Sequence, residues 1–188
     1  MADPVSEPRQ FPDVASWEAW LEAHAETETE IWVKIAKKGS GIPSITVREA
    51  LEGVLCFGWI DGQRKGWDEQ FFLQRYCRRR ARSTWSQVNV DLVAKLAEEG
   101  RMRASGLREV ERAQADGRWE MAYVSQRDFV LPDDFQAALD ANPAAAAAYS
   151  SLGKTAQYLA AFPAIKAKTP AGRASAISVA IDRLAASE

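Results

Sequence analysis

The sequence predicts an α+β fold in which a small N-terminal half, with strands and a β-hairpin, is followed by a helical C-terminal half. The first observation is that residues 59–80 alternate apolar and polar side chains, as half-buried strands do. The second is that apolar residues from position 83 onward recur with a helical period between capping and glycine signals. The 188 residues are 47% hydrophobic and 27% charged, which suits a globular domain with a sizeable core.

The N-terminal half starts with residues 1–15, which contain three prolines and are expected to form an extended arm. Ser16 is expected to cap a helix that ends near Ala25. The single histidine, His24, falls on the apolar face of that helix, and we interpret it as packing at the edge of the core. The segment EIWVKIA (30–36) has the β-branched and aromatic content of a strand.

A second helix is signalled by the capping box of Thr46 and Glu49, and Phe57-Gly58 is expected to end it. WIDGQRKGW (59–67) and FFLQRYCRRR (71–80) then form the predicted hairpin. Strict alternation would place five side chains on one face of its first strand: Trp59, Asp61, Gln63, Lys65 and Trp67.

Caps and breakers predict the helices of the C-terminal half. Ser86 is expected to cap 87–99, Ser105 to cap 106–116, and Pro132 to take the first position of 133–141. Further helices are expected from Pro143 to Gly153, over 154–168 with a break at Pro163, and over 174–187. The predicted organisation is an arm (1–15), an α+β core domain with the arginine-rich hairpin (16–125), and a helical region packed on that core (126–188).

Charge is distributed unevenly, although the net charge is only −2. Residues 1–31 carry eight acids and one arginine, which gives −7, whereas residues 63–82 carry seven bases and two acids, which gives +5. Such asymmetry indicates a partner of complementary charge, unless the acidic head (residues 1–31) lies across the basic segment (residues 63–82).

Several function classes are disfavoured. No run of 18 apolar residues suits a transmembrane helix, and the N-terminus lacks the regions of a signal peptide, so a cytoplasmic location without membrane insertion is expected. Cys56 and Cys77 are expected to be free thiols, and one histidine leaves no material for a metal site or a histidine triad. We expect neither a metal nor a cofactor.

Several motifs occur together and in a fixed order: LCFGWIDGQ (55–63), an arginine at 75 followed by the pair at 79 and 80, S-x-W-S-x-x-N (83–89), G-R-M (100–102), A-S-G-L (104–107) and A-x-x-D-G-R-W (113–119). Through them the chain resembles the bacterial YdeI/OmpD-associated proteins over roughly residues 15–123, and more weakly to the C-terminus. The resemblance implies a role in stress or in bacteriocin and antimicrobial-peptide resistance, and it supplies no catalytic residues.

The arginines suggest a site for a small anion that carries phosphate or carboxylate, because guanidinium groups bind such oxygens in pairs. Ser83 and Ser86 stand at a predicted helix N-terminus, which also favours anions, and the aromatic residues would stack on a ring. The predicted ligand-binding residues are Trp59, Asp61, Arg64, Arg75, Arg79, Arg80, Ser83, Trp85, Ser86 and Asn89. We expect Arg79→Ala to abolish binding and to leave the fold intact.

Other interpretations of the same residues stay open. If the hairpin is only structural, its outward charges are solvated strand residues: Arg78, Arg80 and Arg82. Ser83 and Ser86 would then be helix caps, and the tryptophans would be core residues. Single-stranded nucleic acid is a second ligand class, which the acidic composition disfavours. A protein partner would dock on the alanine-rich helices 144–161, on a face that includes Tyr149, Tyr158, Leu159 and Phe162. An enzyme would use Ser83, Ser86, Cys56 or Cys77, the last with a pKa lowered by its arginines if exposed; without a base-and-orienter set we do not expect a classical enzyme.

Overall fold

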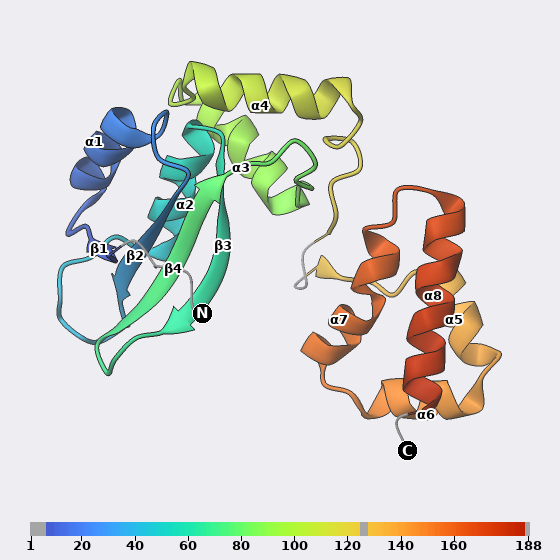
Figure 1. Ribbon diagram of the computed structural model, residues 1–188. Helices are drawn as coiled ribbons and strands as arrows, with labels where there is room; N and C mark the ends of the chain where they lie inside the picture. Colours follow the sequence, from blue (N-terminus) through green and yellow to red (C-terminus); the bar gives the residue numbers. More distant parts are fainter. Residues whose placement is uncertain (1–6, 125–127, 187–188) are drawn as a thin grey trace. The chain divides into compact units, whose positions relative to one another are not determined.

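The computed structural model describes residues 7–124 and 128–186. They belong to two compact units: Met1–Trp85 with Asn89–Glu120, and Ser86–Val88 with Met121–Glu188. The first unit contains a four-stranded sheet and the second is helical, which confirms the predicted α+β class (Figure 1). Residues 1–6 of the predicted arm lie outside the described residues, as does residue 125 at the end of the predicted core domain.

The sheet of the first unit has the strand order β1-β2-β4-β3. β2 (Glu30–Ala36), β3 (Trp59–Gly66) and β4 (Phe71–Arg78) follow the predicted segments closely, and β4 pairs antiparallel with both neighbours. The short strand β1 (Arg9–Gln10) was not predicted, because two residues are too few for an alternating pattern. It lies parallel to the edge of β2.

The β3–β4 pairing contains one irregularity, between Asp61 and Arg64. Because one shifted residue sends all later side chains to the opposite face, the predicted single row from Trp59 to Trp67 is wrong. Asp61 stands opposite Tyr76, whereas Lys65 stands opposite Leu73, on the other side of the sheet.

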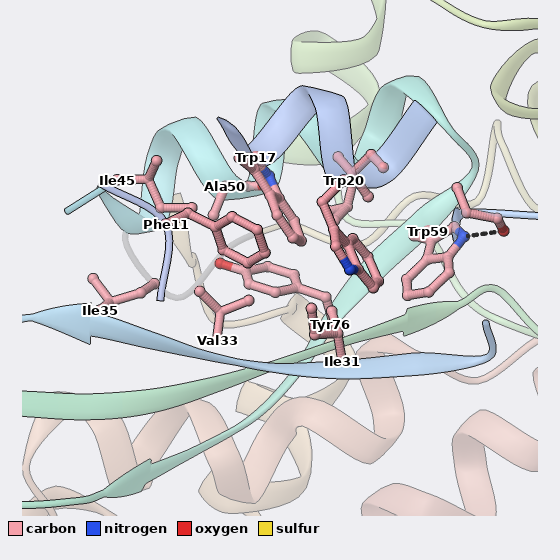
Figure 2. Close-up of a cluster of buried hydrophobic side chains, with 13 residues drawn as sticks. Phe11, Trp17, Trp20, Ile31, Val33, Ile35, Ile45, Ala50, Trp59 and Tyr76 are labelled. Carbon is pink, nitrogen blue, oxygen red and sulfur yellow. Dashed lines mark hydrogen bonds between the residues drawn. The ribbon is translucent and has the colours of Figure 1, made fainter. Parts of the chain in front are cut away.

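One face of the sheet is covered by α1 (Val14–His24) and α2 (Val47–Cys56), and an aromatic core fills the space between (Figure 2). The rings of Trp17 and Trp20 stack with centroids 5.5 Å apart, and Trp17 donates a hydrogen bond to the Ala50 carbonyl at 3.2 Å. The capping box at the start of α2 is confirmed. At the start of α1 the predicted cap is wrong: the Asp13 carboxylate accepts from the Ser16 N–H at 2.7 Å, so Asp13 is the N-cap.

Two further helices complete the first unit: α3 (Gln87–Glu98), whose first two residues are assigned to the second unit, and α4 (Ala104–Ala115). Gly100, in the left-handed region at φ 68°, follows α3 as predicted. Ser105 was predicted to cap the next helix, but α4 begins one residue before it, with Arg103 at the N-cap.

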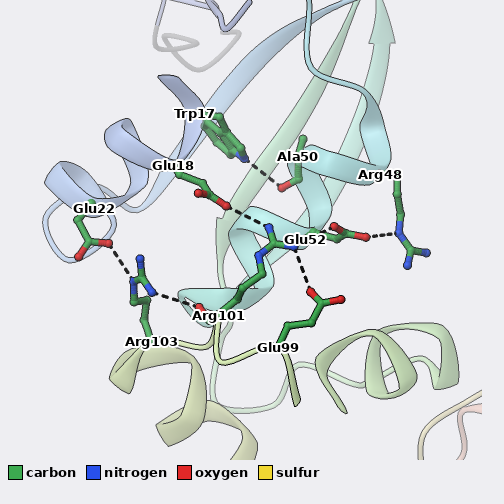
Figure 3. Close-up of polar contacts among 9 residues, drawn as sticks. All are labelled: Trp17, Glu18, Glu22, Arg48, Ala50, Glu52, Glu99, Arg101 and Arg103. Atoms are coloured by element: carbon green, nitrogen blue, oxygen red, sulfur yellow. Dashed lines mark hydrogen bonds and ion pairs between the residues drawn. The ribbon is translucent and has the colours of Figure 1, made fainter. Parts of the chain in front are cut away.

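The acidic head of the chain pairs mainly with the turn between α3 and α4, and less with the hairpin (Figure 3). Arg101 contacts Glu18 at 3.0 Å and Glu52 at 3.3 Å, and Arg103 contacts Glu22 at 3.1 Å. Of the hairpin arginines, Arg75 forms an ion pair with an acid of this head, Glu30. The alternative in which the head covers the basic segment therefore holds for Arg75, while other head acids are bound at the α3–α4 turn.

The second unit packs four helices around its own core: α5 (Asp133–Asp140), α6 (Pro143–Ser151), α7 (Lys154–Ile165) and α8 (Pro170–Ala185). Three predicted details are wrong. Pro163 lies inside α7 and does not break it, and α8 begins at Pro170, capped by Thr169, which is four residues earlier than predicted. Pro132 is the N-cap of α5 and not its first residue. No helix in the described part of the chain is both long and apolar enough to cross a membrane.

Candidate functional site

A polar pocket of about 430 Å³ lies in the first unit, where the ends of α1, α2 and β4 meet the side of α4. Four arginines line it: Arg78 and Arg79 from the end of β4, and Arg108 and Arg112 from α4. Two carboxylates, Glu26 and Glu109, share the wall, so these side chains sum to +2. Ala25, Phe57 and Trp59 add apolar surface. This combination of converging guanidiniums and a partly apolar wall suits an anion with a small organic body.

Two glycines allow α4 to approach the end of α2 closely enough to form the pocket. A Cβ atom on Gly106 would lie 2.2 Å from the Cys56 carbonyl oxygen. Gly58 has a φ of 79°, and a Cβ atom there would lie 2.9 Å from Cγ of Glu109 and 3.0 Å from the Ser105 carbonyl oxygen. The glycines of the F-G-W and A-S-G-L motifs therefore set the distance between the two halves of the pocket wall.

The arginines from β4 are held by backbone carbonyls. Nε of Arg78 donates to the Ala25 carbonyl at 3.1 Å, and Nη1 of Arg79 donates to the Thr84 carbonyl at 3.1 Å. Within the described residues Nη2 of Arg78 is buried without a hydrogen-bond partner. A buried donor of this kind favours binding of an acceptor, because leaving it unpaired is costly.

The arginines from α4 are held by carboxylates of the pocket. Arg112 contacts Glu109 at 2.7 Å, and Arg108 contacts Glu26 at 3.6 Å. Both arginine side chains are more than half exposed, so these ion pairs contribute little energy and each arginine can exchange its carboxylate for another anion.

Arg79 also belongs to a buried cluster that unites three of the sequence motifs. Its guanidinium carbon lies 3.4 Å from the centre of the Trp85 ring, and Trp119 packs edge-on against the same ring at 4.8 Å. Arg118, also buried, contacts Asp116 at 2.7 Å and donates to the Ser83 carbonyl at 2.9 Å. The arginine pair, S-x-W-S and D-G-R-W thus meet in one place, and sequence reasoning missed Arg118 because it lies far along the chain from the hairpin.

Of the ten predicted ligand-binding residues, Trp59 and Arg79 line the pocket. Trp59 is a core residue whose Nε1 donates to the Ala25 carbonyl at 3.2 Å. Arg64 and Arg75 do not converge as expected: Arg64 stands opposite Gln74, the neighbour of Arg75, so the two arginines lie on opposite faces of the sheet. Arg64 lies over Phe72, and Arg75 pairs with Glu30.

Asp61 lies on the exposed part of β3, outside the pocket lining. Loss of hydration beside the sheet raises the pKa of its carboxyl, and the charges of Arg79 and Arg64 offset this only in part. Asp61 is thus electrostatically linked to Arg79 without forming the pocket wall.

The remaining predicted residues also lie outside the pocket lining. Arg80 is exposed, and its backbone N–H donates to Oγ of Ser83 at 2.9 Å. Trp85 is buried under Arg79, and Asn89 is a buried residue of α3. Ser86 belongs to the second unit, where it pairs with Tyr123.

The two cysteines do not supply an activated nucleophile. Burial raises the pKa of Cys56 to about 11. Cys77 was expected to have a lowered pKa if exposed; it is half-buried, and burial raises its pKa despite the opposing charges of Arg75 and Arg80.

The face proposed for a protein partner is mostly interior. Tyr149 and Tyr158 are buried in the second unit, whereas Leu159 is 59% exposed. The sequence periodicity did not separate these residues, because an alanine-rich helix has little contrast between its faces.

Two family models match the chain. Residues 9–109 match the model described as "Domain of unknown function (DUF8412)", and residues 128–187 match the model described as "Bacteriocin-protection, YdeI or OmpD-Associated". No curated protein and no solved structure matches. The lining of the arginine pocket falls within residues 9–109 except for Arg112.

Proposed function

We propose that the first unit of this chain, which belongs to the family described as "Domain of unknown function (DUF8412)", binds a small anion in the arginine pocket. The C-terminal residues 128–187 match the YdeI/OmpD-associated family model. The resemblance to YdeI/OmpD-associated proteins is confirmed by residues 128–187, although the motifs that suggested it lie between residues 55 and 119. A role in bacteriocin protection is suggested by the family description alone and stays a proposal.

The observation that carries the proposal is the convergence of Arg78, Arg79, Arg108 and Arg112 on one pocket that holds only two carboxylates. Four guanidiniums at close range repel one another, and Glu26 and Glu109 neutralise half of that charge. A bound phosphate or carboxylate would neutralise more and would accept from the buried Nη2 of Arg78. We therefore place the proposed ligand site at the end of β4 and on α4, and not on a hairpin face shared by Arg64, Arg75 and Arg79.

Isothermal titration calorimetry with sodium phosphate and sodium citrate, at constant ionic strength, tests the proposal. Arg108 is the residue to change, because its side chain is 58% exposed and contributes little to packing. Arg82→Ala is the matched control: it also removes one exposed arginine, and Arg82 does not line the pocket. We expect Arg108→Ala to weaken binding by roughly tenfold or more and Arg82→Ala to leave it unchanged.

Thermal denaturation gives a second readout, since a ligand at 100 times its Kd adds about 2.7 kcal/mol to the free energy of unfolding. If neither anion produces heat or a thermal shift, or if both variants weaken binding equally, the pocket is not an anion site.

A further inference from the structure

The four arginines of the pocket differ in whether their partners can be replaced. Arg78 and Arg79 donate to main-chain carbonyls, which stay in place with the fold. Arg108 and Arg112 contact the side chains of Glu26 and Glu109, which can rotate away. An incoming anion therefore competes with these two carboxylates for the arginines of α4.

Glu109 is the stronger of the two competitors. Its side chain is only 15% exposed, against 80% for Glu26, and it holds Arg112 at 2.7 Å, against 3.6 Å for the contact between Glu26 and Arg108. Its Cγ lies close to Gly58, where an added Cβ would be 2.9 Å from it, so the stem packs beside the pocket while the carboxylate can still turn away from Arg112. A carboxylate held in this way has a high local concentration beside its arginine.

We infer that Glu109 is a built-in competitor of the ligand, and that the pocket selects a dianionic phosphoryl group over a monocarboxylate, because the dianion gains more when it replaces the Glu109 carboxylate. The inference rests on the anion-binding function proposed above. A monocarboxylate has the same charge and the same two oxygens as Glu109, so an exchange between them gains little. A phosphate monoester brings a second charge and a third terminal oxygen, and it can engage the α4 arginines together with the buried Nη2 of Arg78.

The test is Glu109→Gln, which keeps the length of the side chain and removes its charge. The probes are inorganic phosphate and acetate, titrated at pH 7.5 and constant ionic strength. In the wild type we expect phosphate to bind and acetate to bind much more weakly. In Glu109→Gln we expect phosphate affinity to rise roughly fivefold, the equivalent of one exposed ion pair, and acetate affinity to rise as well, because both anions displace the same carboxylate.

Glu111→Gln is the control, because Glu111 is an exposed residue of the same helix that does not line the pocket. Glu111→Gln makes the same change in net charge, so it measures how far the loss of one negative charge outside the pocket alters anion affinity. If phosphate binds the wild type and the two variants equally well, the anion site stands and the role of Glu109 is wrong. A weaker affinity in Glu109→Gln also overturns the inference. If none of the three proteins binds phosphate or acetate, the anion-binding function itself is wrong.

Discussion

The guanidinium carbon of Arg79 lies 3.4 Å from the centre of the Trp85 ring, and both side chains are buried. A desolvated cation on an indole is worth about 2 kcal/mol or more, and the stack also fills core volume. Arg79 is thus a structural residue as well as a member of the pocket wall, which changes what its replacement is expected to do.

We predict that Arg79→Ala lowers the free energy of unfolding by roughly 2–4 kcal/mol, because it removes the stack and leaves a cavity over Trp85. Urea denaturation followed by tryptophan fluorescence measures this, and Arg82→Ala provides the exposed-arginine control. The expectation from the sequence that Arg79→Ala leaves the fold intact is the competing outcome: unchanged stability would show that the stack with Trp85 contributes little to folding.

Gly106→Ala separates helix propensity from packing. Within a helix the change should gain about 1 kcal/mol, because alanine is the better helix former. At Gly106, however, the new Cβ would lie 2.2 Å from the Cys56 carbonyl oxygen, a main-chain atom that cannot rotate away. We therefore expect a net loss of roughly 1–3 kcal/mol in the free energy of unfolding, measured by urea denaturation.

Gly66→Ala is the control for that experiment, because no atom lies within 4 Å of a Cβ built on Gly66. Its effect should stay within about 0.5 kcal/mol. A stabilised Gly106→Ala protein would contradict the close approach of α4 to the end of α2.

Local signals predicted the helices and strands well where a single residue or motif could mark the start or end of the element. Thr46 and Glu49 three residues apart mark a helix start, and the change to alternation after Gly58 marks the hairpin. The errors arise where two signals compete. Asp13 and Ser16 are both good caps three residues apart, and only the structure shows that Asp13 accepts the hydrogen bond.

The site was harder to predict than the fold because its halves are distant in sequence. Arg78 and Arg79 lie in the segment that composition singled out, but Arg108 and Arg112 look like ordinary charges on the exposed face of a helix. No local sequence signal indicates that Arg108 and Arg112 lie beside the end of β4. The irregularity between Asp61 and Arg64 also had no sequence signature beyond Gly62, although it decides which hairpin side chains share a face.

Thiol reactivity provides a test of the surroundings of the two cysteines. Burial raises the pKa of Cys56 to about 11 and also raises that of Cys77, so both thiols should be protonated at neutral pH. We expect both to react more slowly with iodoacetamide at pH 7.5 than a free thiol does, and Cys77 to react before the more deeply buried Cys56. The urea-unfolded chain is the control for full reactivity. Rapid labelling of native Cys77 at pH 7.5 would instead indicate a thiolate favoured by its arginines.

Acid should weaken the second unit through Asp134. Two oxygens of this carboxylate accept from Arg173 at 2.6 and 2.7 Å, and this pairing lowers the pKa of Asp134 in the folded chain below its ordinary value of 3.8. A lowered folded-state pKa means that the stabilisation is complete above pH 3.8 and is lost as the pH falls through the folded-state pKa. Because both side chains are partly exposed, we expect the pair to contribute no more than about 1 kcal/mol.

Asp134→Asn isolates this contribution. All seven tryptophans lie in the first unit, so tryptophan fluorescence reports on that unit, whereas circular dichroism at 222 nm reports on the helices of both. At pH 7 the variant should unfold at lower urea concentration by circular dichroism, with its fluorescence transition unchanged. Below the folded-state pKa of Asp134 the difference between variant and wild type should vanish, because protonation has already removed the charge. A difference that persists at low pH would assign the effect to packing or to hydrogen bonds of the neutral side chain, and not to the ion pair with Arg173.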